Sequence, residues 1–197
     1  MSGSGGAGEV LLVRHAETDW SRDGRHTGLT DIPLTDRGRA AGRALAERLV
    51  GRDPELVLVS PSRRARETCE LCGLGGRAQV REDLHEWDYG DYEGLTTAEI
   101  RELRPGWELW RDGCPGGESP AQVGARADRV LAELRSAAVQ SAVFSHGHAL
   151  RVLGARWISL EPAAGARLGL DTGALCLLGH ERATEILLRW NDAGGAL

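Results

Sequence analysis

The sequence predicts an α/β fold, a single domain built on an open sheet with a site at one edge. Three short, mainly apolar runs, at 10–13, 56–59 and 141–144, are typical of buried strands. Each is followed by arginine, histidine or serine. At 197 residues with 41% hydrophobic content, the chain can bury one good core. We therefore expect one domain over residues 1–197, with its ligand beyond the carboxyl ends of the strands.

Composition excludes several classes of function. The net charge of −5 argues against a protein that neutralises nucleic-acid phosphates. All 24 basic residues are arginine, so mechanisms that need a lysine, such as Schiff-base chemistry or a P-loop, are excluded. Residues 1–8 are mostly small, so we expect a flexible N-terminus, and they do not resemble a secretion signal. No apolar run approaches the roughly 20 residues that span a bilayer, so we expect a cytoplasmic protein with no membrane partner.

The four cysteines do not indicate a metal centre. Cys69 and Cys72 form a CxxC pair, but Cys114 and Cys176 stand alone, so a structural zinc site would lack its second ligand pair. We expect reduced, partly buried thiols and no metal.

The first strand, Val10 to Val13, leads into the most informative stretch. Arg14 offers a planar fork of donors that suits an oxyanion, and His15 can be neutral and nucleophilic near neutral pH. The stretch 19–28 is rich in glycine and polar residues, which predicts an irregular loop returning over the strand end. Within this loop lie groups that can bind phosphate or serve only ordinary turn chemistry, namely Ser21, Thr27 and the amide of Gly28.

The second strand and its flanking helices repeat the pattern. Thr35 is the expected N-cap of a helix from Asp36 to about Val50, and Leu56 to Val59 forms the strand. A helix then begins within 62–66, where a bidentate arginine would add to the anion preference of the helix N-terminus. Arg64 is the chosen candidate, with solvent-exposed side chains as the alternative for the arginines at 63 and 66.

An acidic, aromatic segment follows a short strand predicted from Val80 to Leu84. Between residues 85 and 94, carboxylates and aromatic rings alternate. A carboxyl packed against an indole or phenol ring loses hydration, which favours its protonated form and suits a general acid. Glu86 and Asp88 both qualify, and an exposed acidic turn is the alternative.

The last third of the chain supplies a third strand end. We expect helices from Thr96 to Leu103 and from Ser119 to about Ala138, with a lid or side wall at 107–117 between them. Ser141 to Phe144 is a strand, and His146 precedes a helix to about Ser159, where its ring could complete a phosphate cage. His148 is either a ligand or a structural histidine. Strands from Ala174 to Leu178 and from Glu185 to Leu188 form the sheet's edge, and 191–197 is a flexible tail.

Several blocks, in order along the chain, resemble the histidine phosphatase superfamily with its phosphoglycerate-mutase-like fold. They are Arg14-His15-Ala16-Glu17-Thr18, Thr27-Gly28, Leu34-Thr35-Asp36-Arg37-Gly38, Ser60-Pro61 with Arg64-Ala65 and Thr68, Glu86 with Tyr89-Gly90 and Glu93-Gly94, Gly117-Glu118-Ser119, and Ser145-His146-Gly147. The resemblance implies a three-layer α/β/α sandwich with a mostly parallel central sheet. It also implies that His15 is phosphorylated, that Arg14, Arg64 and His146 hold the phosphoryl group, and that Glu86 protonates the leaving oxygen. By the same match, the pocket is lined by Ser21, Thr27, Gly28, Tyr89, Gly147 and His148.

The resemblance implies a phosphatase of small phosphomonoesters that needs no metal or other cofactor. Ala16 stands where the family usually has glycine, and Ser21 stands where the mutases have asparagine. The lysine-free segment between Glu86 and Gly117 is shorter than in the mutases, which favours a phosphatase over a cofactor-dependent phosphoglycerate mutase. The motifs look most like the subgroup of sedoheptulose-1,7-bisphosphatase and related acid phosphatases, so sugar phosphates are the expected substrates. A catalytically silent phospho-ligand binding module is a further alternative, and a homodimer is compatible with the sequence.

Overall fold

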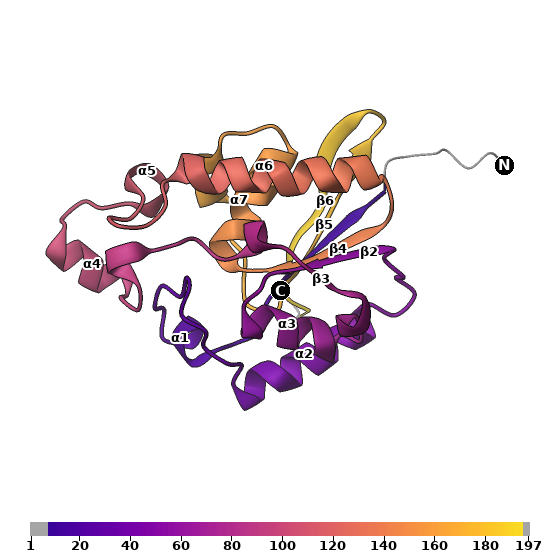
Figure 1. The fold of residues 1–197 in the computed structure, drawn as a ribbon, viewed down its shortest axis with the longest axis horizontal. Helices are drawn as coiled ribbons and strands as arrows, with labels where there is room; N and C mark the ends of the chain where they lie inside the picture. The colour runs from indigo at the N-terminus through magenta and orange to yellow at the C-terminus, as the bar shows by residue number, and fades with distance from the viewer. Residues whose placement is uncertain (1–7, 195–197) are drawn as a thin grey trace.

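A six-stranded sheet forms the centre of the computed structural model, which describes residues 8–194 (Figure 1). The strand order is β3-β2-β4-β1-β5-β6. The pairs β1/β4, β2/β4 and β2/β3 are parallel, whereas β5 runs antiparallel to β1 and to β6. The strands are β1 (Val10–Arg14), β2 (Leu56–Val59), β3 (Gln79–Val80), β4 (Ser141–Ser145), β5 (Leu175–Glu181) and β6 (Thr184–Asp192).

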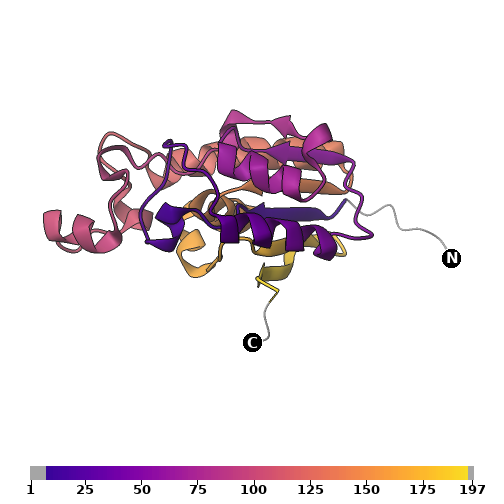
Figure 2. The same ribbon diagram turned by 90° about the horizontal axis from the view of Figure 1, so that it is seen from below.

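Helices cover both faces of the sheet, which gives the predicted three layers (Figure 2). The helices are α1 (Asp19–Arg22), α2 (Asp36–Arg48), α3 (Arg63–Leu71), α4 (Thr97–Leu103), α5 (Leu109–Asp112), α6 (Pro120–Ala137) and α7 (Gly147–Trp157). Alternate residues of a strand point to opposite faces. Accordingly, Leu12 packs in a core with α6 and α7, and Val13 packs in a second core with α2 and α3.

The longer helices begin at the capping residues that the sequence predicts. The Thr35 hydroxyl accepts a hydrogen bond from the amide of Gly38 at the start of α2. Ser119 and Gln122 form a capping box at the start of α6, and Pro120 occupies its first turn.

Three local predictions are wrong. The stretch after β1 contains the short helix α1 instead of an irregular loop, because Thr18 and Ser21 form a capping box. The strand predicted from Val80 to Leu84 is only the two-residue β3, followed by a 3₁₀ turn, Glu82–Leu84. The predicted tail from residue 191 begins inside β6, where the Asn191 side chain exchanges hydrogen bonds with Asp171.

The predictions of flexible ends fall mostly on residues 1–7 and 195–197, outside the described part of the chain. Within residues 8–194, no helix combines the length and the apolar character needed to cross a bilayer. The carboxyl ends of the parallel strands face the side of the molecule where α1, α4 and α5 lie (Figure 1). The fold therefore directs the candidate site residues toward these three short helices.

Candidate active site

The three strand ends singled out in the sequence meet at one edge of the sheet. β4 lies between β1 and β2, and the His15 amide donates to the carbonyl of Ser145 at 2.9 Å. The Ser60 amide donates to the carbonyl of Phe144, also at 2.9 Å. Parallel pairing thus brings His15, Ser60 and His146 together from positions far apart in the chain.

His15 is buried and held as a neutral imidazole. Its Nδ1 lies 2.7 Å from the carbonyl oxygen of Ala16, which can only accept, so Nδ1 carries the proton. Burial lowers the pKa of His15 well below 6.5, and the nearby Arg64 and Arg14 lower it further. The other nitrogen, Nε2, is therefore unprotonated, as a nucleophile requires.

Arg64 and His146 form a fully buried pair next to His15. Arg64 Nε donates to His146 Nδ1 at 3.1 Å, and its terminal nitrogens donate to the carbonyls of Thr27, Gly28 and Thr30. Because His146 Nδ1 accepts from Arg64, the proton resides on Nε2, which donates to Ser60 Oγ at 2.7 Å. Burial, followed by Arg64 and His15, lowers the pKa of His146 well below 6.5. The ring centroids of His15 and His146 are 5.2 Å apart, but the residues that line the cavity do not include His146 or Arg64.

Arg14 lies on the cavity wall with a donor still available. One terminal nitrogen donates to the carbonyl of Leu170, while the buried Nε has no hydrogen-bond partner within residues 8–194. A buried donor without an acceptor is costly, by about 1–3 kcal/mol, so this nitrogen favours an oxyanion ligand. The guanidinium packs on Gly147, where an added Cβ would come within 3.2 Å of Arg14 Cζ. The lack of a side chain at Gly147 therefore leaves space for the Arg14 guanidinium.

Backbone amides hold the side chain of Glu86, whose carboxylate lies at the start of α7. Its carboxylate accepts hydrogen bonds from the amides of Trp87, His148 and Ala149 at 2.8–3.0 Å. His146, the residue before α7, makes no side-chain cap of its own, so the carboxylate satisfies free amides of this helix. Glu86 is the one carboxyl group among the described residues that line the cavity.

An ion pair between a buried arginine and a half-buried glutamate supports the backbone on either side of Glu86. Arg126, from α6, pairs with Glu118 at 2.8 Å and donates to the carbonyls of Asp83, His85 and Glu86. Glu118 in turn accepts from the amide of Asp88. Sequence reasoning missed Arg126, because an arginine on a long helix is ordinarily a solvated side chain.

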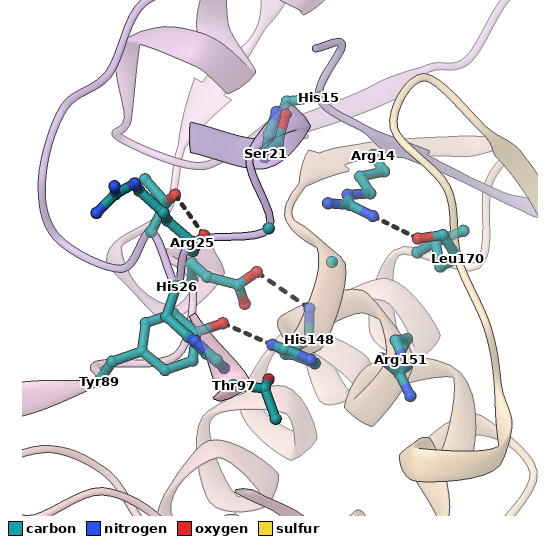
Figure 3. A pocket seen from close by; sticks show the side chains of 14 residues that line it. Arg14, His15, Ser21, Arg25, His26, Tyr89, Thr97, His148, Arg151 and Leu170 are labelled. Carbon is teal, nitrogen blue, oxygen red and sulfur yellow. Dashed lines mark hydrogen bonds between the residues drawn. The ribbon is translucent and has the colours of Figure 1, made fainter. Parts of the chain in front are cut away.

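The cavity in front of His15 has a volume of about 200 Å³ (Figure 3). Of the predicted lining residues, Ser21, Thr27, Tyr89, Gly147 and His148 reach it. Further lining residues that sequence reasoning missed are Gly24, Arg25, His26, Thr97, Arg151 and Leu170. They come from loops and helices whose contact with the strand ends no local pattern reveals.

Gly28 and Ser21 are engaged differently from what the sequence predicts. The Gly28 amide donates to the Glu93 carboxylate at 2.9–3.0 Å, and Gly28 does not line the cavity. Ser21 lines the cavity, but its hydroxyl donates to the carbonyl of Thr18 and accepts from the Thr18 amide. Neither group is therefore a free phosphate donor.

Two histidines, His26 and His148, line the cavity together with Tyr89. The Tyr89 hydroxyl and His148 Nδ1 are 2.6 Å apart, and burial raises the pKa of Tyr89 well above 10, so the phenol is protonated. His26 packs edge-on against Tyr89, and its Nδ1 lies 2.8 Å from the carbonyl oxygen of Leu95. Burial lowers the pKa of both histidines, so this part of the cavity offers neutral hydrogen-bonding groups.

The cysteines contribute nothing to this cavity. All four are unpaired and buried, more completely than the sequence predicts, and burial raises the pKa of Cys69 and Cys72 to about 12. Their thiols are therefore protonated and packed in the core.

A neutral histidine beside Arg14 and the buried Arg64, at the carboxyl edge of a mostly parallel sheet, combines a nucleophile with cations that suit a phosphoryl group. The model of the histidine phosphatase superfamily (branch 1) matches residues 10–193, and the chain belongs to this family. An acid phosphatase from Mycobacterium tuberculosis is 45% identical over 183 residues, which are 90% of this chain and 89% of that protein. Sedoheptulose 1,7-bisphosphatase from Saccharomyces cerevisiae is 38% identical in an alignment 182 residues long. The alignment covers 76% of this chain and 67% of the yeast protein.

Solved structures give the same family and fold. The product of the open reading frame Rv3214 from Mycobacterium tuberculosis superposes with a TM-score of 0.88 at 43% identity, covering 95% of this chain and 99% of that one. A mycobacterial glucosyl-3-phosphoglycerate phosphatase superposes with a TM-score of 0.82 at 30% identity, covering 93% and 98%. The predicted phosphoglycerate-mutase-like architecture is thus confirmed.

Proposed function

We propose that this protein is a metal-independent phosphatase that hydrolyses small phosphomonoesters, sugar phosphates in particular, through a phosphohistidine on His15. The observation that carries the proposal is the neutral His15 ring, with Nδ1 tied to the Ala16 carbonyl, beside the unsatisfied Nε of Arg14. The names of two relatives, acid phosphatase and sedoheptulose 1,7-bisphosphatase, support the reaction and the substrate class.

The proposed first step transfers the phosphoryl group to His15. Nε2 attacks phosphorus in line with the ester oxygen, the ester P–O bond breaks, and Arg14 stabilises the charge on the phosphoryl oxygens. Arg64 and His146, next to His15, also hold the phosphoryl group in this proposal, while burial and then the Arg64 cation lower the pKa of His15 and keep its ring neutral. Glu86, the carboxyl group that lines the cavity, enters this step in its protonated form and gives its proton to the departing alkoxide, which leaves Glu86 as a carboxylate.

In the proposed second step, water attacks phosphorus and the P–N bond breaks, which returns the electron pair to His15. Glu86, left as a carboxylate by the first step, takes the proton from this water. The products are inorganic phosphate and the free alcohol, and no oxidant, metal or second substrate is needed for the balance.

Hydrolysis of p-nitrophenyl phosphate tests the proposal directly. A phosphatase releases phosphate, whereas a silent phospho-ligand binding module releases none. Supplying 3-phosphoglycerate with its bisphosphate primer separates a phosphatase from a mutase, because efficient formation of 2-phosphoglycerate would overturn the assignment. Acid-labile phosphate on His15 in rapidly quenched reactions tests the intermediate.

We also propose a cytoplasmic location, since the four cysteines are unpaired thiols, as is usual in a reducing compartment. The expected partner is the small phosphomonoester, and a homodimer is compatible with the sequence. Cell fractionation followed by immunodetection tests this location, and recovery in a secreted fraction would contradict it.

A further inference from the structure

Glu93 belongs to the acidic, aromatic segment 85–94, but the proposed reaction gives it no role. Its side chain is partly buried and does not line the cavity. The two carboxylate oxygens accept hydrogen bonds from the Gly28 amide at 2.9 and 3.0 Å, and Oε1 also accepts from the Thr30 amide at 3.1 Å. Glu93 therefore binds the amide side of the 27–30 loop.

Arg64 binds the same loop through its carbonyl oxygens. Nη2 donates to Thr27 at 3.0 Å and to Gly28 at 2.9 Å, and Nη1 donates to Thr30 at 3.0 Å. The Thr27 carbonyl and the Gly28 amide belong to one peptide group, and in a trans peptide the two point in opposite directions. This peptide group therefore lies between the Arg64 guanidinium and the Glu93 carboxylate and is hydrogen-bonded to both.

The close approach of Glu93 to the loop requires glycine at position 28. A Cβ on Gly28 would come within 2.6 Å of Glu93 Oε2. The backbone next to Glu93 is also paired with the chain that leads into the loop. The Gly94 amide donates to the His26 carbonyl at 2.8 Å, and the His26 amide donates to the Leu95 carbonyl at 2.9 Å. These contacts hold the carboxylate in place against the loop.

The two hydrogen bonds of the shared peptide group reinforce each other. A carboxylate at the N–H and a guanidinium at the C=O polarise the peptide in the same direction, and this effect is stronger in a buried environment than in water. Burial lowers the pKa of Arg64, and the negative charge of Glu93 is among those that oppose this shift. Glu93 thus stabilises the charged guanidinium through the peptide group between them.

Arg64 has a single donor left for a ligand. A guanidinium carries five N–H groups, and four of those of Arg64 are used in bonds to His146 and to the three carbonyls of the 27–30 loop. The remaining N–H, on Nη1, has no partner within residues 8–194. Because the other four bonds fix its direction, a shift of the 27–30 loop would redirect this donor.

We propose that Glu93 is a positioning residue, which holds the 27–30 loop so that the remaining N–H of Arg64 points at the phosphoryl group beside His15. This inference rests on the proposed phosphatase function and adds a residue that acts on the phosphoryl group through Arg64. A donor that is already fixed before the ligand arrives costs less free energy to order on binding, which increases the affinity.

Binding of inorganic phosphate tests the proposal without turnover. Titration calorimetry gives the Kd of the wild type, and Glu93→Ala is expected to raise it about tenfold, because the acceptors of Arg64 are no longer held in place. Glu93→Gln keeps one acceptor oxygen but loses the charge, so it should raise the Kd less, about threefold. Glu102→Ala is the matched control, since it removes the same charge from an exposed side chain of α4 outside the cavity. It should leave the Kd unchanged.

A double-mutant cycle assigns the effect to Arg64. Arg64→Lys keeps the charge but lacks the fork of donors that meets the three carbonyls, so adding Glu93→Ala to it should change the Kd by less than about twofold. Thermal unfolding shows which variants are folded, and Glu93→Gln replaces Glu93→Ala in the cycle if the alanine variant does not fold.

Two results would overturn the proposal. One is an unchanged Kd in the folded Glu93 variants, and the other is an effect of Glu93 that is equally large with arginine or lysine at position 64. The second result would mean that Glu93 supports the fold without acting through Arg64. Absence of phosphate release from any ester would instead overturn the proposed function, and the Kd values would still decide the role of Glu93.

Discussion

Replacing Glu86 with glutamine tests the role of this carboxyl group in proton transfer. Glutamine is nearly isosteric, and its oxygen can still accept from the amides of Trp87 and Ala149, which now share Oε1. Its NH₂ group would face the His148 amide, which now donates to Oε2 at 3.0 Å, so that one charge-assisted hydrogen bond is lost. We expect the free energy of unfolding to fall by about 1–3 kcal/mol, with the fold retained.

The effect on catalysis depends on the leaving group. An alkoxide leaves poorly without a proton, so kcat for fructose 6-phosphate is expected to fall about 10²–10⁴-fold, the usual contribution of a general acid. The p-nitrophenolate of an activated aryl ester leaves without protonation, so its rate should fall much less. Phosphate release from both esters, with thermal unfolding measured alongside, gives the comparison.

Equal slowing of both esters would remove Glu86 from the acid role. The variant Glu133→Gln is a matched control, since Glu133 lies outside the cavity in an ion pair with Arg81. It should leave both rates unchanged. A control that slowed either ester would show that the comparison reports stability and not proton transfer.

The remaining predictions concern the nucleophile, its surroundings and the support of the acid. His15→Ala should abolish turnover and acid-labile labelling, and labelling that survives would point to another nucleophile. Because the pKa of His15 is lowered, its ring stays neutral below pH 6.5. The value of kcat/KM should therefore show no loss from His15 protonation until the pH falls through the lowered pKa. A pH–rate profile that loses activity with a midpoint at pH 6.5 would contradict this expectation. Gly147→Ala should displace Arg14 and lower kcat/KM about tenfold or more, with a thermal midpoint close to wild type. Arg126→Met removes the cation that pairs with the half-buried Glu118, so denaturant titration should show a loss of about 1–3 kcal/mol. The value of kcat should fall for alkyl esters more than for aryl esters, because the backbone at Glu86 loses its support.

Strands, long helices and the edge of the sheet that carries the site could be predicted from the sequence. The apolar run of β2 is bounded by glycine and proline on one side and by serine and proline on the other. Residues close in the sequence therefore mark where this strand begins and ends. Thr35 and Ser119 mark the helix starts for the same reason, since capping depends on residues three positions apart. Short-range chemistry decides these elements, and short-range patterns reveal them.

The rest depended on contacts between distant segments. Arg64 and His146 are predicted as phosphate ligands from the family resemblance, but no local pattern shows that both side chains are buried, bonded to each other, with Arg64 also bonded to backbone carbonyls. Arg151 looks like any solvated arginine of an amphipathic helix until the segment around Gly165 folds against it. No spacing along the chain encodes which arginine meets a carboxylate and which meets a carbonyl.

Arg64 meets backbone carbonyls and not a carboxylate, and this helps to keep His15 uncharged. Had Arg64 paired with a buried carboxylate, the pair would be neutral overall and its effect on His15 would largely cancel. Its terminal nitrogens instead meet the carbonyls of Thr27, Gly28 and Thr30, which satisfy the donors without removing the charge. Burial lowers the pKa of both His15 and His146, and the positive charge of Arg64 lowers it further, so two imidazoles 5.2 Å apart are held neutral together. In the proposed mechanism the same charge also attracts a phosphoryl dianion toward the His15 ring, so Arg64 both helps to keep the proposed nucleophile neutral and favours its substrate.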